Sequence, residues 1–277
     1  MKITNKTQLN LLIGAPLEHS QSPVLHEACY QQLGINAVLL ASPPCSQFKS
    51  LIQTIKTLAV KLTAVTAPYK EKVIKYLDQC SFEVSQLQAA NTIIQRDGKL
   101  CGYNTDIDGI SFALRHITLH KKQALIIGAG GAACAIAYFL KKNHAKLFWI
   151  NRTRKKASVL AKKFGGRVIY HDELSDLPID IIINTTPVGL YPNSKVSPLP
   201  HYLFHKKQVV FDLVYNPLVT PLLKQAKKQQ AKIISGLDMF IGQGLKQIEL
   251  LTDEVFTPTN IHALKKILIR NQQVAYK

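Results

Sequence analysis

Short apolar runs alternate with longer stretches of mixed polarity over the first hundred residues. The runs predict strands at 10–13, 37–40 and 62–66, and the apolar spacing between them predicts helices from Ser22, at 45–58 and at 70–77. Ser22 and Pro23 favour a helix start, with the serine as N-cap and the proline in the first turn. Segments 89–95 and 99–103 flank Arg96-Asp97-Gly98, which indicates a hairpin.

The second half of the chain repeats this alternation with more strongly apolar strands. Strands are predicted at 124–127, 146–150, 167–170, 180–184, 209–213 and 232–234. The run Ile181-Ile182-Ile183 is typical of a parallel strand that is buried on both faces. Several prolines between 186 and 200 indicate a loop, and the spacing from about Met239 to the end predicts helices.

This order of elements predicts an α/β protein, and the length of 277 residues favours two domains over one small core. We expect an N-terminal α/β domain at 1–105 and a doubly wound Rossmann domain at 106–238. The helices of 239–277 are expected to pack back on the first domain.

A phosphate-binding turn is predicted directly after the strand at 124–127. Gly128-Ala129-Gly130-Gly131-Ala132-Ala133 has the pattern G-x-G-x-x-A between a strand and a helix, as in a dinucleotide site. Gly128 permits the tight turn, Gly130 lets the backbone approach a pyrophosphate, and Ala133 keeps helix and strand close. The free N–H groups at the start of the helix would face the phosphates. The alternative is a tight turn with no ligand.

The end of the following strand indicates which dinucleotide binds. An NAD site usually places Asp or Glu there to hold the ribose hydroxyls. This chain has Asn151-Arg152-Thr153-Arg154 instead. Because guanidinium groups form charge-assisted, often bidentate bonds with phosphate, these residues predict NADP, with its 2′-phosphate. A basic surface loop is the plainer interpretation.

The charge of the chain is strongly positive and unevenly distributed. The formal net charge is +18, and residues 106–238 carry 20 basic and 8 acidic side chains. This excess would attract a polyanionic cofactor, although lysine-rich solvated helix faces also explain it. Nucleic acid is not an expected partner, because no nucleic-acid motif is visible and the aromatic residues do not interleave with the lysines.

Cysteine and histidine spacing gives no sign of a metal site. The five cysteines include no C-x-x-C pair, and the nine histidines are scattered, so we expect neither a metal nor a disulfide framework.

The first residues lack the apolar run of a signal peptide, and the longest apolar stretch, 124–140, contains the glycine turn. We therefore expect a cytoplasmic protein without a membrane partner, as a monomer or homodimer.

Four polar clusters stand at predicted strand ends or turns, where open α/β sheets bind ligands. They are His19-Ser20-Gln21-Ser22-Pro23, Thr66-Ala67-Pro68-Tyr69-Lys70, Ala90-Asn91-Thr92 and Asn104-Thr105-Asp106. Each has an ordinary explanation on its own. A Ser-Pro cap accounts for Ser22 but not for Ser20, Lys70 is one of many surface cations, and Asn and Asp commonly form turns.

Together, the clusters resemble the motifs of the shikimate dehydrogenase family, in the same order along nearly the whole chain. Further matching motifs are Gly14-x-Pro16-x-x-His19-Ser20-x-Ser22-Pro23-x-x-His26, Gly128-Ala129-Gly130-Gly131-Ala132, Asn151-Arg152-Thr153, Asn184-x-Thr186-Pro187-x-Gly189, Asp212-x-x-Tyr215-x-Pro217 and Gly236-Leu237-x-Met239-x-x-x-Gln243. The resemblance implies reversible, NADPH-dependent reduction of 3-dehydroshikimate to shikimate in aromatic amino-acid biosynthesis. It also implies that 1–105 is the substrate-binding catalytic domain and 106–238 the NADP-binding domain.

The resemblance assigns roles residue by residue. Lys70 and Asp106 would be the catalytic pair. Substrate contacts would come from Ser20, Ser22, Thr66, Asn91, Tyr215 and Gln243. Cofactor contacts would come from Gly128, Ala129, Gly130, Gly131, Ala132, Asn151, Arg152, Thr153, Arg154, Thr186, Gly236 and Met239.

The catalytic pair makes chemical sense. Hydride delivered to a ketone creates an alkoxide, which needs a proton and a positive neighbour. A protonated Lys70 offers both, and an ionised Asp106 can hold Lys70 in place by an ion pair.

Two positions depart from the family pattern. The family usually has Gly-x-Asn-Val-Thr where this chain has Leu62-Thr63-Ala64-Val65-Thr66, so a substrate-binding Asn is replaced by Ala64. Glu27, where the family often has Asn, is a milder change. These differences leave open a related enzyme that acts on quinate or another hydroxylated cyclic acid. A catalytically weak NADP-binding protein is the third alternative, which retention of Lys70 and Asp106 disfavours.

Overall fold

The computed structural model describes residues 3–275, with side chains as far as Gln272. The backbone divides into two compact units. The first extends to Asp106 and resumes at Gln243, and the second spans Ile107–Gly242. Both boundaries fall inside helices, α5 (Asp106–Leu114) and α9 (Gly236–Thr252).

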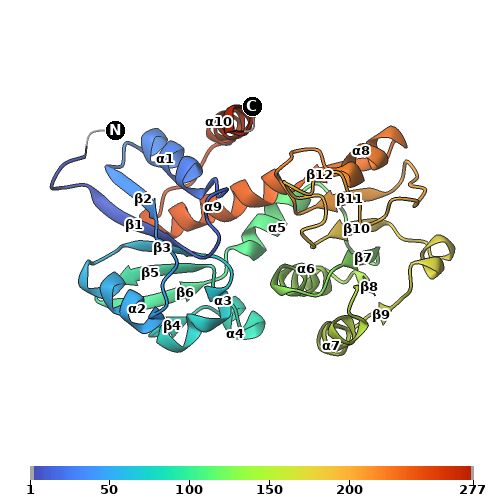
Figure 1. Cartoon of the computed structure of the whole chain (residues 1–277), viewed down its shortest axis with the longest axis horizontal. Helices are drawn as coiled ribbons and strands as arrows, with labels where there is room; N and C mark the ends of the chain where they lie inside the picture. Colours follow the sequence, from blue (N-terminus) through green and yellow to red (C-terminus); the bar gives the residue numbers. More distant parts are fainter. Residues whose placement is uncertain (1–2, 276–277) are drawn as a thin grey trace. The chain divides into compact units, whose positions relative to one another are not determined.

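The first unit is built on a mixed sheet with the order β2-β1-β3-β5-β6-β4 (Figure 1). The strands are β1 (Gln8–Ile13), β2 (Ala37–Ala41), β3 (Leu62–Val65), β4 (Gln79–Cys80), β5 (Thr92–Arg96) and β6 (Lys99–Tyr103). Strand β5 is antiparallel to both of its neighbours, β3 and β6, whereas the other pairs are parallel. The register sets Ala64 beside Thr92, and Thr92 beside Tyr103.

The hairpin between β5 and β6 confirms the prediction from Arg96-Asp97-Gly98. Asp97 and Gly98 both have positive φ, 49° and 73°, as the two-residue type I′ turn requires. The short strand β4 and the helix α4 (Phe82–Leu87) were not predicted. Both are too short to produce a clear hydrophobic period.

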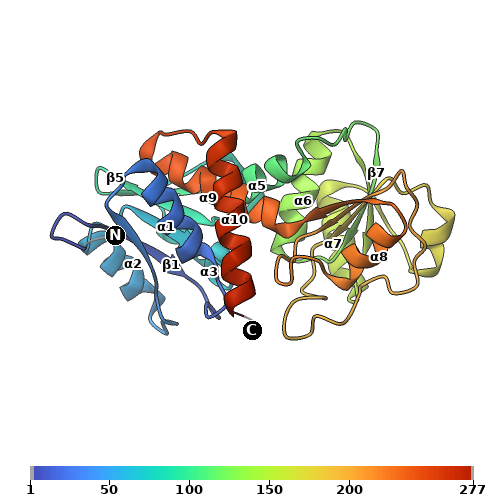
Figure 2. The ribbon, with the colours of Figure 1, turned by 90° about the horizontal axis from the view of Figure 1, so that it is seen from above.

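Helices cover both faces of this sheet. On one face α10 (Pro258–Ala275) lies beside α1 (Ser22–Leu33), so the C-terminal segment packs on the N-terminal helix (Figure 2). On the other face α2 (Phe48–Thr57) buries Phe48, Ile52 and Ile55 in a core shared with the strands. The predicted helix 70–77 is divided into α3 (Tyr69–Lys72) and the 3₁₀ turn η1 (Ile74–Tyr76).

Helix α1 begins at Ser22, as expected, but Ser22 is not its N-cap. Gln21 occupies the cap position, and its side chain makes no capping bond. The Ser22 N–H instead donates to Ser20 Oγ at 3.3 Å. Ser20 therefore satisfies the backbone N–H of Ser22, which has no partner within the helix. This bond gives Ser20 a structural reason to stand two positions before Ser22.

The second unit contains a fully parallel sheet with the order β12-β11-β10-β7-β8-β9. Its strands are β7 (Gln123–Ile127), β8 (Lys146–Ile150), β9 (Arg167–Val168), β10 (Ile181–Asn184), β11 (Val209–Asp212) and β12 (Lys232–Ser235). Its helices include α6 (Gly131–Lys142), α7 (Arg154–Phe164) and α8 (Pro221–Lys228), with the 3₁₀ helix η2 (Asp172–Asp176) before β10. This order is that of a doubly wound Rossmann sheet and confirms the predicted fold class.

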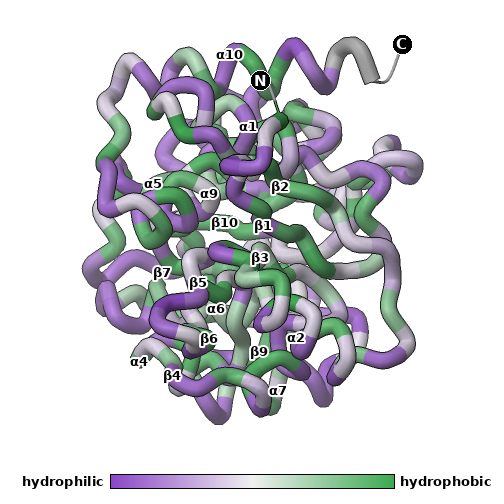
Figure 3. The backbone as a smooth tube through the Cα atoms, turned by 90° about the vertical axis from the view of Figure 1, so that its left-hand side faces the viewer, coloured by the Kyte–Doolittle hydropathy of each residue, from purple (hydrophilic) through white to green (hydrophobic). Residues whose placement is uncertain are grey.

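The strand order reverses between β7 and β10, so their carboxyl ends form the topological switch point where such sheets bind ligands. The strands around this point are strongly apolar and appear green in Figure 3. Leu125, Ile182 and Val210 are buried in one core cluster. The proline-containing segment after β10 is a loop, as predicted. Among the described residues, no helix combines the length and apolar content needed to cross a bilayer.

Candidate active site

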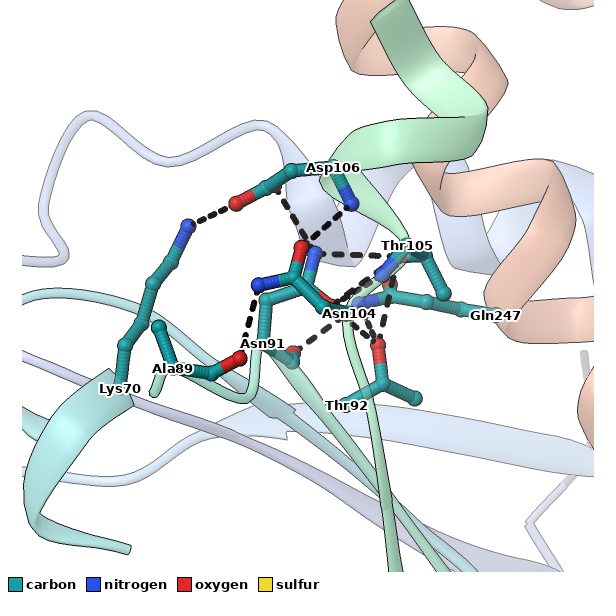
Figure 4. Close-up of polar contacts among 8 residues, drawn as sticks. All are labelled: Lys70, Ala89, Asn91, Thr92, Asn104, Thr105, Asp106 and Gln247. Atoms are coloured by element: carbon teal, nitrogen blue, oxygen red, sulfur yellow. Dashed lines mark hydrogen bonds and ion pairs between the residues drawn. The ribbon is translucent and has the colours of Figure 1, made fainter. Parts of the chain in front are cut away.

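An ion pair joins Lys70 and Asp106 in the first unit (Figure 4). Lys70 is the second residue of α3, and Asp106 is the first residue of α5. Lys70 Nζ lies 2.6 Å from Asp106 Oδ2, and the two side chains are 31% and 14% exposed. The ammonium is thus held in a defined place yet reaches solvent, as a proton donor to a bound molecule must.

Asn91 holds the other oxygen of the Asp106 carboxylate. Asn91 Nδ2 donates to Asp106 Oδ1 at 2.9 Å and to Thr105 Oγ1 at 3.0 Å. Asn91 Oδ1 accepts from the Thr105 N–H at 2.7 Å and from the Thr92 hydroxyl at 2.9 Å. Both atoms of the amide are therefore engaged within the protein, so a substrate hydroxyl would share or replace one of these bonds.

Asn104 fixes the start of α5. Asn104 Oδ1 accepts from the Asp106 N–H at 3.2 Å, while Asn104 Nδ2 donates to the Ala89 carbonyl at 2.8 Å. Three of the four polar clusters found in the sequence thus meet in one network (Figure 4). The carboxylate at the helix N-terminus is also favoured by the helix dipole.

A second layer of this network lies in the protein interior and was not anticipated. Gln247, on α9, donates from Nε2 to Thr92 Oγ1 at 2.9 Å, and its Oε1 lies 2.9 Å from His26 Nε2. Burial lowers the pKa of His26 to about 4, against a smaller opposing effect of the bond to Gln247. One feature of the sequence could have indicated Gln247: it lies one helical turn after Gln243, among the apolar residues Leu245 and Ile248.

The other expected substrate residues of the first unit stand at element ends. Ser20 Oγ and Ser22 Oγ lie 3.3 Å apart, half-buried at the N-terminus of α1. Thr66 directly follows β3 and packs closely on Gly14. A Cβ added at Gly14 would lie 2.2 Å from Thr66 Cγ2. Gln243 is half-buried on α9.

Tyr215 differs from these residues because it belongs to the second unit. Its ring stacks on Phe240, with centroids 4.8 Å apart and an interplanar angle of 21°. This stacking holds the tyrosine beside the first turns of α9.

The glycine turn of the second unit has the local geometry of a phosphate cradle. Gly128 has φ +117°, and a Cβ there would lie 2.3 Å from Thr185 Oγ1. By contrast, a Cβ at Gly130 or Gly131 would meet no heavy atom within 4 Å. Ala133 is fully buried, and Ala129 and Ala132 are half-buried. The turn therefore leaves the N-terminus of the twelve-residue helix α6 accessible, which fits a pyrophosphate.

The residues after β8 fit a 2′-phosphate. Arg152, Thr153 and Arg154 are exposed, and Asn151 Nδ2 shapes the turn by donating to the Thr153 carbonyl at 2.8 Å. The Arg154 guanidinium lies 3.6 Å above the centre of the Tyr170 ring, which holds it by a cation–π contact. The donor set contains two guanidiniums and no carboxylate, so its chemistry suits NADP better than NAD.

The remaining expected cofactor residues also lie in the second unit. Thr186 Oγ1 donates to Asn184 Oδ1 at 2.7 Å, and Thr186 Cγ2 lies beside Gly128. Gly236 has no space for a side chain, since a Cβ would lie 2.1 Å from the Leu213 carbonyl oxygen. Met239 is half-buried in the first turns of α9.

Asp212 is a buried carboxylate at the end of β11. It accepts bonds from Thr220 Oγ1 at 2.6 Å, Asn184 Nδ2 at 2.9 Å and the Val214 N–H at 3.1 Å. Burial raises its pKa to about 6, although each of these bonds acts in the opposite direction. These contacts connect the ends of β10 and β11 with the start of α8. No group of three or more His, Cys, Asp or Glu in the described part of the chain is placed to hold a metal ion.

Comparison with known protein families finds a match in each of the two units. Residues 12–93 match the family model described as shikimate dehydrogenase substrate binding domain, and residues 111–233 match that of shikimate / quinate 5-dehydrogenase. The NADP(+)-dependent shikimate dehydrogenase of Methanocaldococcus jannaschii is 40% identical over 96% of this chain and 98% of its own length.

Solved structures show the same relationship. A crystal structure of a shikimate dehydrogenase in complex with NADP+ has a TM-score of 0.90 and 38% identity, covering 98% of this chain and 97% of its own. The structure of the Thermus thermophilus shikimate 5-dehydrogenase, in complex with NADP(H) and shikimate, has a TM-score of 0.85 and 32% identity. The match covers 94% of this chain and 98% of the Thermus chain. The sequence motifs, the two sheets and these relatives agree: the chain belongs to the shikimate dehydrogenase family.

Proposed function

We propose that this protein catalyses the reversible NADPH-dependent reduction of 3-dehydroshikimate to shikimate, a step of aromatic amino-acid biosynthesis. The observation that carries the proposal is the Lys70–Asp106 pair, 2.6 Å apart and braced by Asn91 in the unit whose sequence matches a substrate-binding domain. The relatives described above support the same reaction.

Lys70 is the proton donor in the direction of reduction. When bound, NADPH supplies the hydride. As negative charge develops on the substrate oxygen, the Lys70 ammonium stabilises it and transfers a proton to that oxygen. Asp106 keeps the ammonium in position. In the direction of oxidation Lys70 is neutral and accepts the proton from the substrate hydroxyl.

The hydroxyls of Ser20 and Ser22 are the proposed partners of the substrate carboxylate. They stand at the N-terminus of a twelve-residue helix, where the dipole and free N–H groups favour an anion. Thr66, Asn91 and Gln243 would contact the ring hydroxyls, and Tyr215 would lie near the carboxylate. These residues would hold the charged carboxylate at one end of the substrate and form hydrogen bonds along the ring.

NADP is assigned to the second unit. The turn of Gly128 to Ala132 would hold the pyrophosphate, and Asn151, Arg152, Thr153 and Arg154 would hold the 2′-phosphate. Thr186, Gly236 and Met239 complete the proposed cofactor contacts. The substrate-binding catalytic domain would then be residues 1–105 with the helices of 239–277, and the NADP-binding domain residues 106–238.

A second candidate is a related enzyme that prefers quinate or another hydroxylated cyclic acid. The observation that favours it is Ala64, which is 2% exposed on β3 and replaces the Asn usual in the family. Losing one hydrogen bond costs about 0.5–1.5 kcal/mol, so a change of substrate preference is physically reasonable.

Progress curves at the NADPH absorbance band separate these candidates. Shikimate and quinate are each tested with NADP+ and with NAD+. A rise with shikimate and NADP+ supports the proposal, and a rise with quinate alone favours the second candidate. If cofactor binding is measurable and neither acid produces a rise, the protein binds NADP without this catalysis and the proposal fails.

We further propose a cytoplasmic monomer or homodimer. Cys29, Cys45, Cys80 and Cys101 are thiols that form no disulfide, as is usual in a reducing compartment. Size-exclusion chromatography with light scattering measures the oligomeric state directly, and a mass above that of a dimer contradicts this part of the proposal.

A further inference from the structure

A continuous line of hydrogen bonds runs from the core of the first unit to the Lys70 ammonium. Gln247 Nε2 donates to Thr92 Oγ1, the Thr92 hydroxyl donates to Asn91 Oδ1, and Asn91 Nδ2 donates to Asp106 Oδ1. Asp106 Oδ2 then accepts from Lys70 Nζ. Figure 4 shows these groups arranged in this order from α9 to α3.

The direction of the line is determined by groups that can only accept. Gln247 Nε2 also lies 3.3 Å from the Asn91 carbonyl oxygen, so this end of the amide must be the donor. Gln247 Oε1 therefore faces His26, whose Nε2 must carry the proton. His26 Nδ1 then accepts from the Tyr30 hydroxyl at 3.2 Å, and Tyr30 in turn accepts from Asn10 Nδ2 at 2.8 Å.

Burial makes alternative arrangements costly. His26 and Thr92 are 0% exposed, and Asn91 and Gln247 are each 2% exposed. Water therefore has little access to replace a missing partner, and a flipped amide would oppose two acceptors or two donors. The Asn91 amide has one satisfied orientation, in which Nδ2 faces the Asp106 carboxylate and Oδ1 faces the Thr105 N–H and the Thr92 hydroxyl.

Among the described residues, Gln247 is the one on α9 that contacts the Thr92 hydroxyl, and the strand neighbour of Thr92 cannot replace it. Ala64, the register partner of Thr92 on β3, has no polar side-chain atom. The orientation of Thr92 is therefore coupled to a helix that also carries Gln243, one turn earlier.

We infer that Gln247 is a positioning residue for catalysis: through Thr92, and together with the Thr105 N–H, it holds the amide of Asn91 and hence the Asp106 carboxylate that orients Lys70. The inference rests on the proposed function. Two residues, Thr92 and Asn91, separate Gln247 from Asp106, so loss of Gln247 should lower turnover much more than it weakens the binding of NADP+.

The test compares near-isosteric apolar replacements. Gln247→Met and Thr92→Val are each expected to lower kcat for shikimate oxidation about tenfold, with a much smaller change in the Kd of NADP+. Thr92→Ser, which keeps the hydroxyl, should recover most of the loss. The double variant should be no slower than the slower single variant, because both substitutions break the same line. If Gln247→Met does not fold, Gln247→Asn retains a buried amide that is too short to reach Thr92.

The control is Gln208→Met in the second unit. Gln208 is 1% exposed and donates to the Ile179 carbonyl and to the Tyr202 hydroxyl, so its loss removes a comparable buried amide far along the chain from Lys70. Thermal unfolding should show destabilisation in both Gln variants, whereas kcat should fall only in Gln247→Met. Equal kcat in Gln247→Met and wild type, or equal losses in the two variants, overturns the inference.

Crystal structures make the test independent of turnover. In Gln247→Met, the Asn91 amide should adopt a second orientation or the Asp106 carboxylate should turn away from Lys70. Unchanged positions of Asn91, Asp106 and Lys70 overturn the inference even if the wild-type protein has no activity with shikimate. Absence of wild-type activity with either acid counts against the proposed function alone.

Discussion

Lys70 Nζ and Asp106 Oδ2 lie 2.6 Å apart although the two residues are separated by 36 positions in the chain. Lys70 comes from α3, after β3, and Asp106 begins α5, after β6. In the mixed sheet, β5 lies between β3 and β6 and is antiparallel to both, so β3 and β6 run in the same direction. Their carboxyl ends therefore lie at the same edge of the sheet, which brings Lys70 and Asp106 together. The relationship supplies the first prediction.

Replacing Lys70 by alanine should reduce turnover far more than it weakens cofactor binding. Loss of a general acid typically costs about 10²–10⁴-fold in rate. Lys70→Ala is expected to lower kcat by this order while the Kd of NADP+ changes by no more than a small factor. Steady-state kinetics and cofactor titration measure the two effects.

Lys72→Ala is the matched control for this variant. Lys72 lies on the same helix, but its ammonium stands 4.8 Å from the centre of the Phe48 ring rather than beside Asp106. Its turnover should stay close to wild type. Equal losses of turnover and cofactor affinity in Lys70→Ala would show that Lys70 is not the proton donor.

Arg152 and Arg154 should determine the preference for NADP over NAD. A charge-assisted bond to phosphate is worth about 1.5–3 kcal/mol, so each alanine substitution should weaken NADP+ binding about tenfold or more. Binding of NAD+, which lacks the 2′-phosphate, should change much less. Fluorescence titration with both cofactors gives the ratio, and Lys162→Ala, near the other end of α7, is the control. Parallel losses for both cofactors would contradict a 2′-phosphate site.

His26 should make the first unit less stable in mild acid. Its folded pKa of about 4 is below the ordinary value of 6.5, so between these values the unfolded chain binds a proton that the folded chain does not. Stability should therefore fall as the pH drops through this range, by up to about 1.4 kcal/mol per pH unit, and level off below about pH 4.

Denaturant unfolding of wild type and His26→Gln across this pH range measures the effect. The variant lacks the titrating group, so the wild-type stability should decline more steeply as the solution becomes acidic. Identical slopes for the two proteins would rule out a buried neutral imidazole at this position.

Asp212 should have the opposite effect in the second unit. Burial raises its folded pKa to about 6 from the ordinary value of 3.8, so between these values the folded protein binds the additional proton. The contribution of Asp212 to stability is present at low pH and lost as the pH rises through about 6. Asp212→Asn removes this dependence. Unfolding followed by the single tryptophan, Trp149 on β8, reports on this unit, and a variant with the wild-type pH slope would refute the assignment.

Much of the architecture could be predicted from the chain because local patterns reflect it. The glycine turn at 128–131, the type I′ hairpin at Asp97-Gly98 and the strands of the Rossmann sheet all depend on neighbouring residues. The first helix begins at Ser22 as predicted, but its N-cap is Gln21 instead of Ser22, and Ser20 accepts the Ser22 N–H. The short β4 and α4 were missed because two to six residues give no reliable period.

The proposed catalytic roles of Lys70 and Asp106 came from motif resemblance, and nothing in their own spacing required that they touch. Only the folded chain shows that both ends of the Asn91 amide form hydrogen bonds here, Nδ2 with Asp106 and Oδ1 with the Thr105 N–H. Gln247 is a stronger example, because it meets Thr92 across 155 positions and lies within an apolar helical stripe.

The amino-acid sequence by itself determined the α/β class and the use of NADP, and it predicted the phosphate-binding turn, since each depends on contiguous residues with fixed chemistry. The tertiary structure alone decided which polar side chains share a buried, fully satisfied network. The physical reason is that hydrophobic periodicity and turn propensity act over a few residues, whereas hydrogen-bond partners in the interior are chosen by strand register and burial.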